Sequence, residues 1–120
     1  MDKLIFIVDD NDANLVLAAS ALDDEFKVLT MPSAQKMFSL LEKKTADLII
    51  LDVEMPDMTG IEAAASLRQN QKFKDTPVIF MTSRDSEEIK PDMIKYNILE
   101  IIKKPIISSA VKNCVKKYIG

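Results

Sequence analysis

Short apolar runs alternate along the chain with longer segments in which apolar residues recur at helical spacing. Five runs have the length of strands, and most are almost continuously apolar, as is typical of buried parallel strands; they cover 4–8, 26–30, 48–51, 78–81 and 98–102. Helices are predicted at 13–22, from 33 onward, from 60 or 61 to 70, between 86 and 96, and at 106–118. This alternation predicts one doubly wound α/β domain over residues 1–120.

Polar residues and a proline mark the ends of these helices. Asn11 or Asp12 can cap the first helix, and Ser33 can cap the second. The segment of the fourth helix contains Pro91, which lacks a backbone donor and clashes with the preceding turn of a helix. Two arrangements remain open there, because the helix either begins near Pro91 or is kinked at it.

Four of the apolar runs end in residues that can do chemistry. Asp9 and Asp10 follow the first run, Asp52 the third, Thr82 the fourth and Lys104 the fifth. Right-handed crossovers place the carboxyl ends of parallel strands along one edge of the sheet, where open α/β sheets bind their ligands. We therefore expect three carboxylates, a hydroxyl and an ammonium group to meet at that edge.

Carboxylates that converge in a partly buried site repel one another and require a cation. Oxygen ligands without Cys or His nearby select Mg²⁺, with Mn²⁺ as a substitute, and Mg²⁺ commonly shares its ligands with a phosphate. Lys104 could neutralise a phosphoryl oxygen, and Thr82 could donate a hydrogen bond to one. Taken singly, Asp9 or Asp10 is explained equally well as a capping or turn residue, and Lys103 is best explained as a solvated lysine.

Composition and charge exclude several other functions. The chain has no histidine, which excludes Ser-His-Asp or Cys-His catalysis, histidine-bound zinc and a phosphohistidine of its own. Only 2 glycines are present, so a Gly-rich nucleotide loop is excluded. The formal net charge of -3 does not indicate the basic surface that binding to nucleic acid or to an anionic membrane requires. With a lone Cys114 and no signal or transmembrane segment, the expected location is cytoplasmic.

The motifs at the strand ends resemble the receiver domain of two-component response regulators. The matching segments are IFIVDDN, LIILDVEMPDMTGIE, VIFMTSRD and IIKKP, in the order and spacing of the family over nearly the whole chain. The resemblance implies a single receiver domain with a flavodoxin-like three-layer sandwich of five βα units. Its parallel five-stranded sheet would have the order 2-1-3-4-5.

The resemblance also implies the chemistry of the site. Asp52 would accept the phosphoryl group, and Mg²⁺ would bridge the two. Asp10 would ligate the metal directly, Asp9 would act through a water, and the backbone carbonyl of Glu54 would be the remaining protein ligand. A histidine kinase or histidine phosphotransfer protein would supply the phosphoryl group, and water would later remove it. This chemistry is self-directed, so we expect no enzyme in the usual sense.

The resemblance further implies how a signal leaves the site. The charge added at Asp52 would draw Thr82 and Lys104 inward and shift a two-state equilibrium of the face built from the fourth helix, fifth strand and fifth helix. That face would contact a downstream effector protein or domain, or a second copy in a homodimer. Ser83 is small, as needed beside a phosphate, and the peptide bond before Pro105 is expected to be cis.

Four positions differ from the usual family pattern. Ile101 stands where an aromatic residue often rotates on activation, and Asn97 stands where a Gly often ends the fourth helix. Asn tolerates the left-handed conformation that such an ending needs. We hypothesise that Glu54 and Arg84 pair across the mouth of the site and affect water access, hence the phosphoryl lifetime; the alternative is two solvated side chains.

Two other functions are possible for such a chain. The first is a receiver-shaped interaction module that is never phosphorylated, and the complete set of strand-end residues argues against it. The second is an aspartate-nucleophile phosphohydrolase. That class resembles D-x-D at its nucleophile, from which Asp52-Val53-Glu54 departs, and the sequence offers no cap domain to select a substrate.

Overall fold

Five parallel strands and five helices alternate through residues 2–120, which the computed structural model describes. The strands form one sheet in the order β2-β1-β3-β4-β5, as predicted. The elements are β1 (Leu4–Val8), α1 (Asp12–Leu22), β2 (Lys27–Met31), α2 (Ala34–Leu41), β3 (Leu48–Asp52), α3 (Gly60–Gln69), β4 (Val78–Thr82), α4 (Ser86–Lys95), β5 (Ile101–Lys103) and α5 (Ser108–Ile119).

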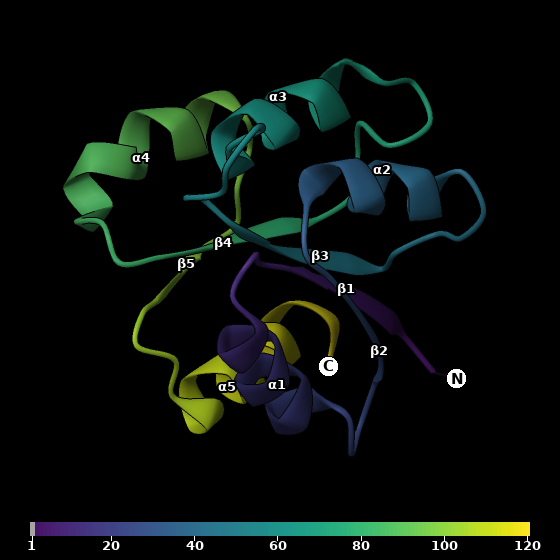
Figure 1. Cartoon of the computed structure of the whole chain (residues 1–120), viewed down its shortest axis with the longest axis vertical. Helices are drawn as coiled ribbons and strands as arrows, with labels where there is room; N and C mark the ends of the chain where they lie inside the picture. Colours follow the sequence, from purple (N-terminus) through teal and green to yellow (C-terminus); the bar gives the residue numbers. More distant parts are fainter. Residues whose placement is uncertain (1) are drawn as a thin grey trace.

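Helices cover both faces of the sheet and give the predicted three-layer sandwich (Figure 1). The helices α2, α3 and α4 lie on one face, while α1 and α5 lie on the other. The central strands β1, β3 and β4 are almost wholly buried because both of their faces are covered. None of the helices within 2–120 is long and apolar enough to cross a bilayer.

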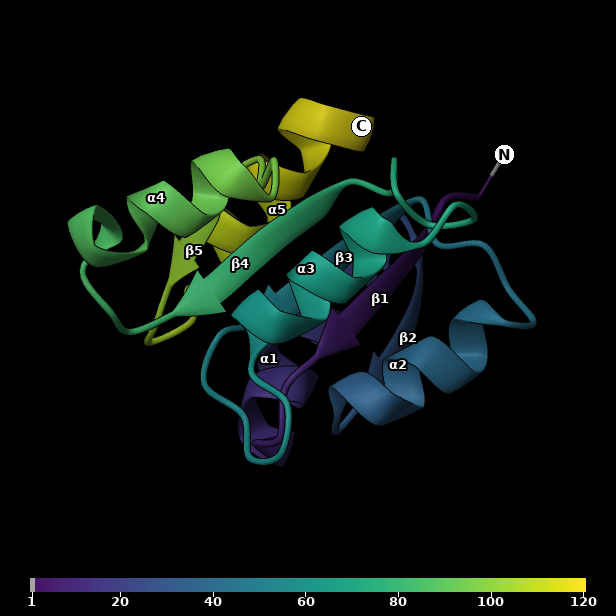
Figure 2. The same cartoon turned by 90° about the horizontal axis from the view of Figure 1, so that it is seen from above.

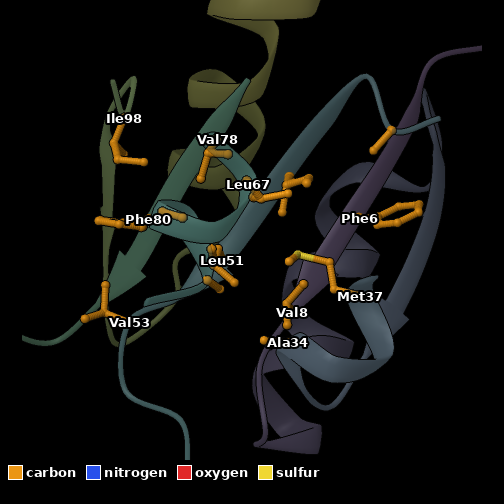
Figure 3. Close-up of a cluster of buried hydrophobic side chains, with 14 of the residues drawn as sticks. Phe6, Val8, Ala34, Met37, Leu51, Val53, Leu67, Val78, Phe80 and Ile98 are labelled. Atoms are coloured by element: carbon orange, nitrogen blue, oxygen red, sulfur yellow. The ribbon is translucent and has the colours of Figure 1, made fainter. Parts of the chain in front are cut away.

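Two hydrophobic clusters join the layers, one on each face of the sheet. Side chains alternate between the faces along a strand, so Phe6 and Phe80 belong to the cluster under α2, α3 and α4, while Ile50 belongs to the opposite one. Figure 3 shows the first cluster, to which Met37 of α2 and Leu67 of α3 contribute. A one-residue slip of a central strand would exchange its two faces, so the burial of both faces fixes the register.

The register places the strand ends side by side. Asp52 of β3 is paired with Met81 of β4, and Thr82 of β4 is paired with Lys103 of β5. Seen from above, the arrowheads of β1 and β4 point toward the same side of the molecule (Figure 2). The carboxyl ends of the strands therefore form the common edge that the sequence predicted.

The predicted helix caps are present beside this edge. The side chain of Asn11 accepts a hydrogen bond from the backbone N–H of Asn14 (3.0 Å), and Ser33 Oγ accepts one from that of Lys36 (3.1 Å). Each bond satisfies a donor that has no partner within the first turn of a helix. The chain can therefore turn into α1 and α2 almost directly after β1 and β2.

The fourth helix resolves the two arrangements that Pro91 left open. It begins after Asp85, whose side chain accepts a hydrogen bond from Glu87 N (3.2 Å), and it continues through Pro91. A start near Pro91 is therefore wrong. The turn after the helix contains Asn97 with a φ of 57°, which confirms the expected left-handed conformation.

The fifth strand is shorter than the sequence predicted. It covers Ile101–Lys103, whereas the apolar run began at Ile98. The segment before it still lies beside β4, because Leu99 N donates to Val78 O (2.9 Å) and Phe80 N donates to Glu100 O (3.0 Å). The apolar run therefore marks a segment that contacts β4, but only its last part has regular strand geometry.

Candidate functional site

Three carboxylates meet at the predicted edge of the sheet. Asp9 and Asp10 follow β1, and Asp52 is the last residue of β3. One oxygen atom from each lies within 4.8 Å of the other two. Asp9 and Asp52 are buried, whereas Asp10 is exposed. The cluster therefore has a buried base and an open, acidic mouth.

Asp9 is held in place by the loop that leads into α1. Its Oδ1 accepts a hydrogen bond from Asn11 N (2.9 Å), and its Oδ2 accepts one from Asn14 Nδ2 (3.1 Å). The same Oδ2 lies 3.2 Å from Lys104 Nζ. The sequence analysis did not identify Asn14 as a partner of Asp9. Its position in the first turn of the helix that follows Asp9 was the only feature that could have indicated this contact. These contacts make Asp9 an oriented acceptor rather than a helix cap, which is Asn11.

Asp52 has one paired and one unpaired oxygen. Its Oδ1 lies 3.0 Å from Lys104 Nζ and 3.3 Å from Glu54 N, which both donate to it. Its Oδ2 is buried and has no hydrogen-bond partner within residues 2–120. The pKa of Asp52 is raised to about 7, mainly by burial. The hydrogen bond and the charge of Lys104 lower this pKa, and the negative charge of Asp9 raises it further. The carboxylate form of Asp52 thus needs more positive charge than Lys104 supplies.

Lys104 is the cation that the cluster already contains. Burial alone would lower the pKa of its ammonium group, but the hydrogen bonds and charges of Asp52 and Asp9 outweigh this and raise it. Its side chain is 19% exposed and touches both carboxylates, so it is not a solvated surface lysine. The Lys104–Pro105 peptide bond is cis, as predicted.

Thr82 occupies the predicted place, but its hydroxyl is already engaged. The residue is buried at the end of β4, and its Oγ1 donates to Glu54 Oε1 at 2.8 Å. The predicted pair of Glu54 and Arg84 is also present, with Arg84 Nε 2.6 Å from Glu54 Oε2. The contact with Thr82 was missed, because a sequence shows which charges can pair but not which rotamer a threonine adopts.

Lys103 differs from its sequence-based interpretation as a solvated lysine. It is exposed, but its ammonium group donates to the backbone carbonyl of Ser83 (3.3 Å) and to that of Arg84. The register explains these contacts, since Lys103 lies opposite Thr82 and so reaches the loop that follows β4. No signal in the sequence distinguished it from an ordinary surface lysine. Lys103 therefore ties β5 to the loop between β4 and α4.

The donor set of the carboxylate cluster fits a hard divalent cation. All the available ligands are oxygen atoms, and no Cys or His contributes to the cluster formed within 2–120. Asp52 Oδ2 is buried without a hydrogen-bond partner among residues 2–120, in a side chain that faces two other carboxylates, which is unfavourable unless a cation or proton joins it. Oxygen ligands of this kind select Mg²⁺ or Mn²⁺.

The expected output face contains apolar residues at its surface. Ile94 of α4 is 74% exposed. Ile101 of β5 is partly buried and packs against the cluster under α2, α3 and α4. Because Ile101 is not aromatic, this position lacks the aromatic side chain whose rotation often accompanies activation in the family. Its role in output stays a prediction.

A parallel α/β sandwich with buried carboxylates at its strand ends belongs to the proteins that bind ligands at the carboxyl edge of the sheet. The model of the family described as "Response regulator receiver domain" matches residues 5–116, and the chain belongs to this family. It is therefore a receiver domain, a phosphorelay signalling switch. Receiver domains typically bind Mg²⁺ in an acidic pocket, and Asp9, Asp10 and Asp52 form such a pocket here.

Curated relatives include both short and long proteins. The polar-differentiation response regulator DivK of Brucella ovis is 26% identical over 125 residues, which cover 100% of this chain and 98% of DivK. The signal transduction histidine-protein kinase BarA of Shigella flexneri is 30% identical over 115 residues, which cover 95% of this chain but 12% of BarA. A probable cyclic di-GMP phosphodiesterase of Vibrio cholerae is 25% identical, and the chain spans 26% of its length.

A solved structure agrees with the fold. The chemotaxis protein CheY4 of Vibrio cholerae, crystallised at low pH, superposes with a TM-score of 0.92 at 24% sequence identity. The match covers 98% of this chain and 99% of CheY4. It shows that the predicted flavodoxin-like arrangement of five strands and five helices is correct.

Proposed function

We propose that Asp52 is the phosphoacceptor of this receiver domain. The observation that carries the proposal is the buried Asp52 carboxylate: its Oδ2 has no hydrogen-bond partner within 2–120, while its Oδ1 lies 3.0 Å from Lys104 Nζ. One of its oxygens also lies within 4.8 Å of an oxygen of Asp9 and one of Asp10. The donor is a phosphohistidine on a histidine kinase or a histidine phosphotransfer protein. Asp52 attacks the phosphorus in line, an O–P bond forms as the N–P bond breaks, and the electron pair returns to the imidazole.

The residues around Asp52 position and neutralise the transferred group. Asp10 would hold Mg²⁺ directly, Asp9 would hold it through a water, and the backbone carbonyl of Glu54 would be a further ligand. When bound, the ion would supply positive charge near the phosphoryl oxygens and would favour the ionised form of Asp52. Lys104 already lies 3.0 Å from Asp52 Oδ1, so a short movement suffices for it to contact a phosphoryl oxygen.

The outcome of phosphorylation is a change at the face built from α4, β5 and α5. The dianionic group on Asp52 attracts Thr82 and Lys104, and the loop after Thr82 connects the site to α4. The face then controls a downstream effector protein or domain, or forms a homodimer. Hydrolysis of the aspartyl phosphate resets the protein, and the domain acts in the cytoplasm on no substrate other than itself.

The direct test is phosphorylation by a small phosphodonor. Incubation with acetyl phosphate and Mg²⁺ should add one phosphoryl group to the wild-type protein, as seen by intact-mass spectrometry, and none to Asp52→Asn or Asp52→Ala. Asp57→Asn is the matched control, because Asp57 is an exposed aspartate in the loop after β3 with a φ of 68°, which Asn tolerates. Labelling that persists without Asp52 contradicts the assignment, and no labelling of the wild type favours an unphosphorylated interaction module.

Binding of Mg²⁺ should stabilise the folded protein. An ion bound only by the folded state adds about 1.4 kcal/mol to the free energy of unfolding at ten times its Kd. We expect Tm to rise with Mg²⁺ in calorimetry of the wild type and of Asp57→Asn, and to rise much less in Asp10→Asn. Equal shifts in all three proteins would show that the ion binds elsewhere.

A further inference from the structure

The Thr82 hydroxyl is fully engaged in this state of the protein. It donates its single proton to Glu54 Oε1 (2.8 Å) and accepts a hydrogen bond from Arg84 N (3.0 Å). A hydroxyl has one proton to donate, so Thr82 cannot donate to a phosphoryl group on Asp52 while it donates to Glu54. The two acceptors exclude each other.

The Glu54 side chain is 41% exposed, but a second partner orients its carboxylate toward this proton. Its second oxygen, Oε2, lies 2.6 Å from Arg84 Nε, and the Arg84 carbonyl accepts a hydrogen bond from Lys103. The backbone of Glu54 is tied to the site as well, since its N–H donates to Asp52 Oδ1 (3.3 Å). Glu54, Thr82 and Arg84 therefore form a closed ring of hydrogen bonds that borders the phosphoacceptor, which we call the Glu54 ring.

We propose that the Glu54 side chain is a positioning residue that holds the receiver in its resting state by competing with the phosphoryl group for the Thr82 hydroxyl. This inference rests on the proposed phosphoacceptor role of Asp52 and deepens it. When Thr82 turns to the phosphoryl group, it gives up both the bond to Glu54 and the bond from Arg84 N. The first residues of the loop between β4 and α4 are thereby released from β4.

The size of the effect follows from the kind of bond that is exchanged. A hydrogen bond to a charged acceptor contributes enough to change an equilibrium constant about tenfold. Removal of the Glu54 carboxylate should therefore make occupation of the phosphoryl site about tenfold more favourable. The Glu54→Gln variant keeps a neutral acceptor and should lie between the wild type and Glu54→Ala.

The first experiment measures the affinity for beryllofluoride, used with Mg²⁺ as a phosphoryl mimic. Amide NMR titrations of the wild type, Glu54→Ala, Glu54→Gln and Glu42→Gln give the apparent Kd of each protein. Glu42 is an exposed carboxylate next to α2 and serves as the control. We expect about tenfold tighter binding by Glu54→Ala and no change in Glu42→Gln. Equal affinities of Glu54→Ala and the wild type would overturn the proposal.

A double-mutant cycle separates competition for the hydroxyl from simple charge repulsion. Thr82→Val removes the hydroxyl but keeps the shape of the side chain and the charge of Glu54. If Glu54 acts through Thr82, Glu54→Ala should have little effect in the Thr82→Val background. If the gain in affinity is the same with and without the hydroxyl, repulsion between Glu54 and the anion explains it, and the proposal is wrong.

A second measurement uses the chemical shift of the Arg84 backbone amide in the ligand-free Glu54→Ala protein. The backbone amide of Arg84 loses its acceptor when Thr82 turns, so its chemical shift reports the ring. In the ligand-free Glu54→Ala protein this shift should move toward its position in the beryllofluoride-bound wild type, and a shift unchanged from that of the resting wild type contradicts the proposal. If the wild type neither binds beryllofluoride nor is phosphorylated, the proposed function itself fails, and this inference fails with it.

Discussion

Replacement of Gly60 by alanine should destabilise the protein by about 3 kcal/mol, the upper part of the range for forcing extra volume into a packed site. A Cβ atom at this position would lie 2.2 Å from the backbone oxygen of Asp52 and 2.9 Å from Val53 Cα. Both neighbours are backbone atoms, which cannot turn aside as a side chain can. The first residue of α3 must therefore be a glycine because β3 passes so close to it.

This reason is a close approach of the backbone and not a special backbone conformation. A glycine before a helix often serves a turn that needs a positive φ, but the φ of Gly60 is not positive in the structure. Urea unfolding of Gly60→Ala should show the loss of stability, whereas Ser66→Ala, on the exposed side of the same helix, should stay within about 0.5 kcal/mol of the wild type. A Gly60→Ala protein as stable as Ser66→Ala would mean that the helix can shift away from β3.

The strand-end site could be predicted from the sequence because simple rules act on it. Each candidate residue follows an apolar run, and parallel strands with right-handed crossovers bring such ends together. The structure brings Asp9, Asp10, Asp52 and Lys104 together as expected. Burial of both faces of β1, β3 and β4 leaves no other register, so the local pattern and the global arrangement agree.

The side-chain contacts of the site and the exact start of β5 could not be predicted from the sequence, because they depend on rotamers and on local backbone geometry. The sequence does not show which acceptor the Thr82 hydroxyl uses, and in the structure it donates to Glu54 Oε1. Lys103 and Lys104 are adjacent and chemically alike, but the alternation of β5 and the turn at Pro105 send one to the loop carbonyls and the other to the carboxylates. The start of β5 was misplaced because Ile98 is apolar and buried in the cluster under α2, α3 and α4, although regular strand geometry begins only at Ile101.

The Asp52→Asn variant should be more stable than the wild type at about pH 8 when no divalent cation is present. The pKa of Asp52 is about 7 in the folded protein, whereas an aspartate in an unfolded chain has a pKa of about 3.9. Between these values the folded state holds a proton that the unfolded state lacks. The wild type therefore loses stability as the pH rises from about 4 to about 7, and the loss is complete above that range.

The variant should lack this pH dependence, because an amide does not ionise. We expect similar free energies of unfolding below about pH 4, where Asp52 is protonated in both the folded and the unfolded wild type. A difference on the order of 4 kcal/mol in favour of Asp52→Asn should develop by about pH 8. Lys104 does not change this sign, since its raised pKa keeps it protonated throughout.

Urea unfolding in EDTA at several pH values measures this difference, and Asp57→Asn, whose replaced carboxylate is exposed, should follow the wild type. Parallel curves for wild type and Asp52→Asn would mean that Lys104 alone compensates the charge of Asp52. Addition of Mg²⁺ at pH 8 should narrow the gap, because only the wild type offers the ion the carboxylate of Asp52. Ionisation of Asp52 without a metal ion costs the folded protein stability, and binding of a cation beside Asp52 recovers that free energy. The site therefore favours Mg²⁺ binding to the ionised carboxylate, which is the form that takes part in phosphoryl transfer.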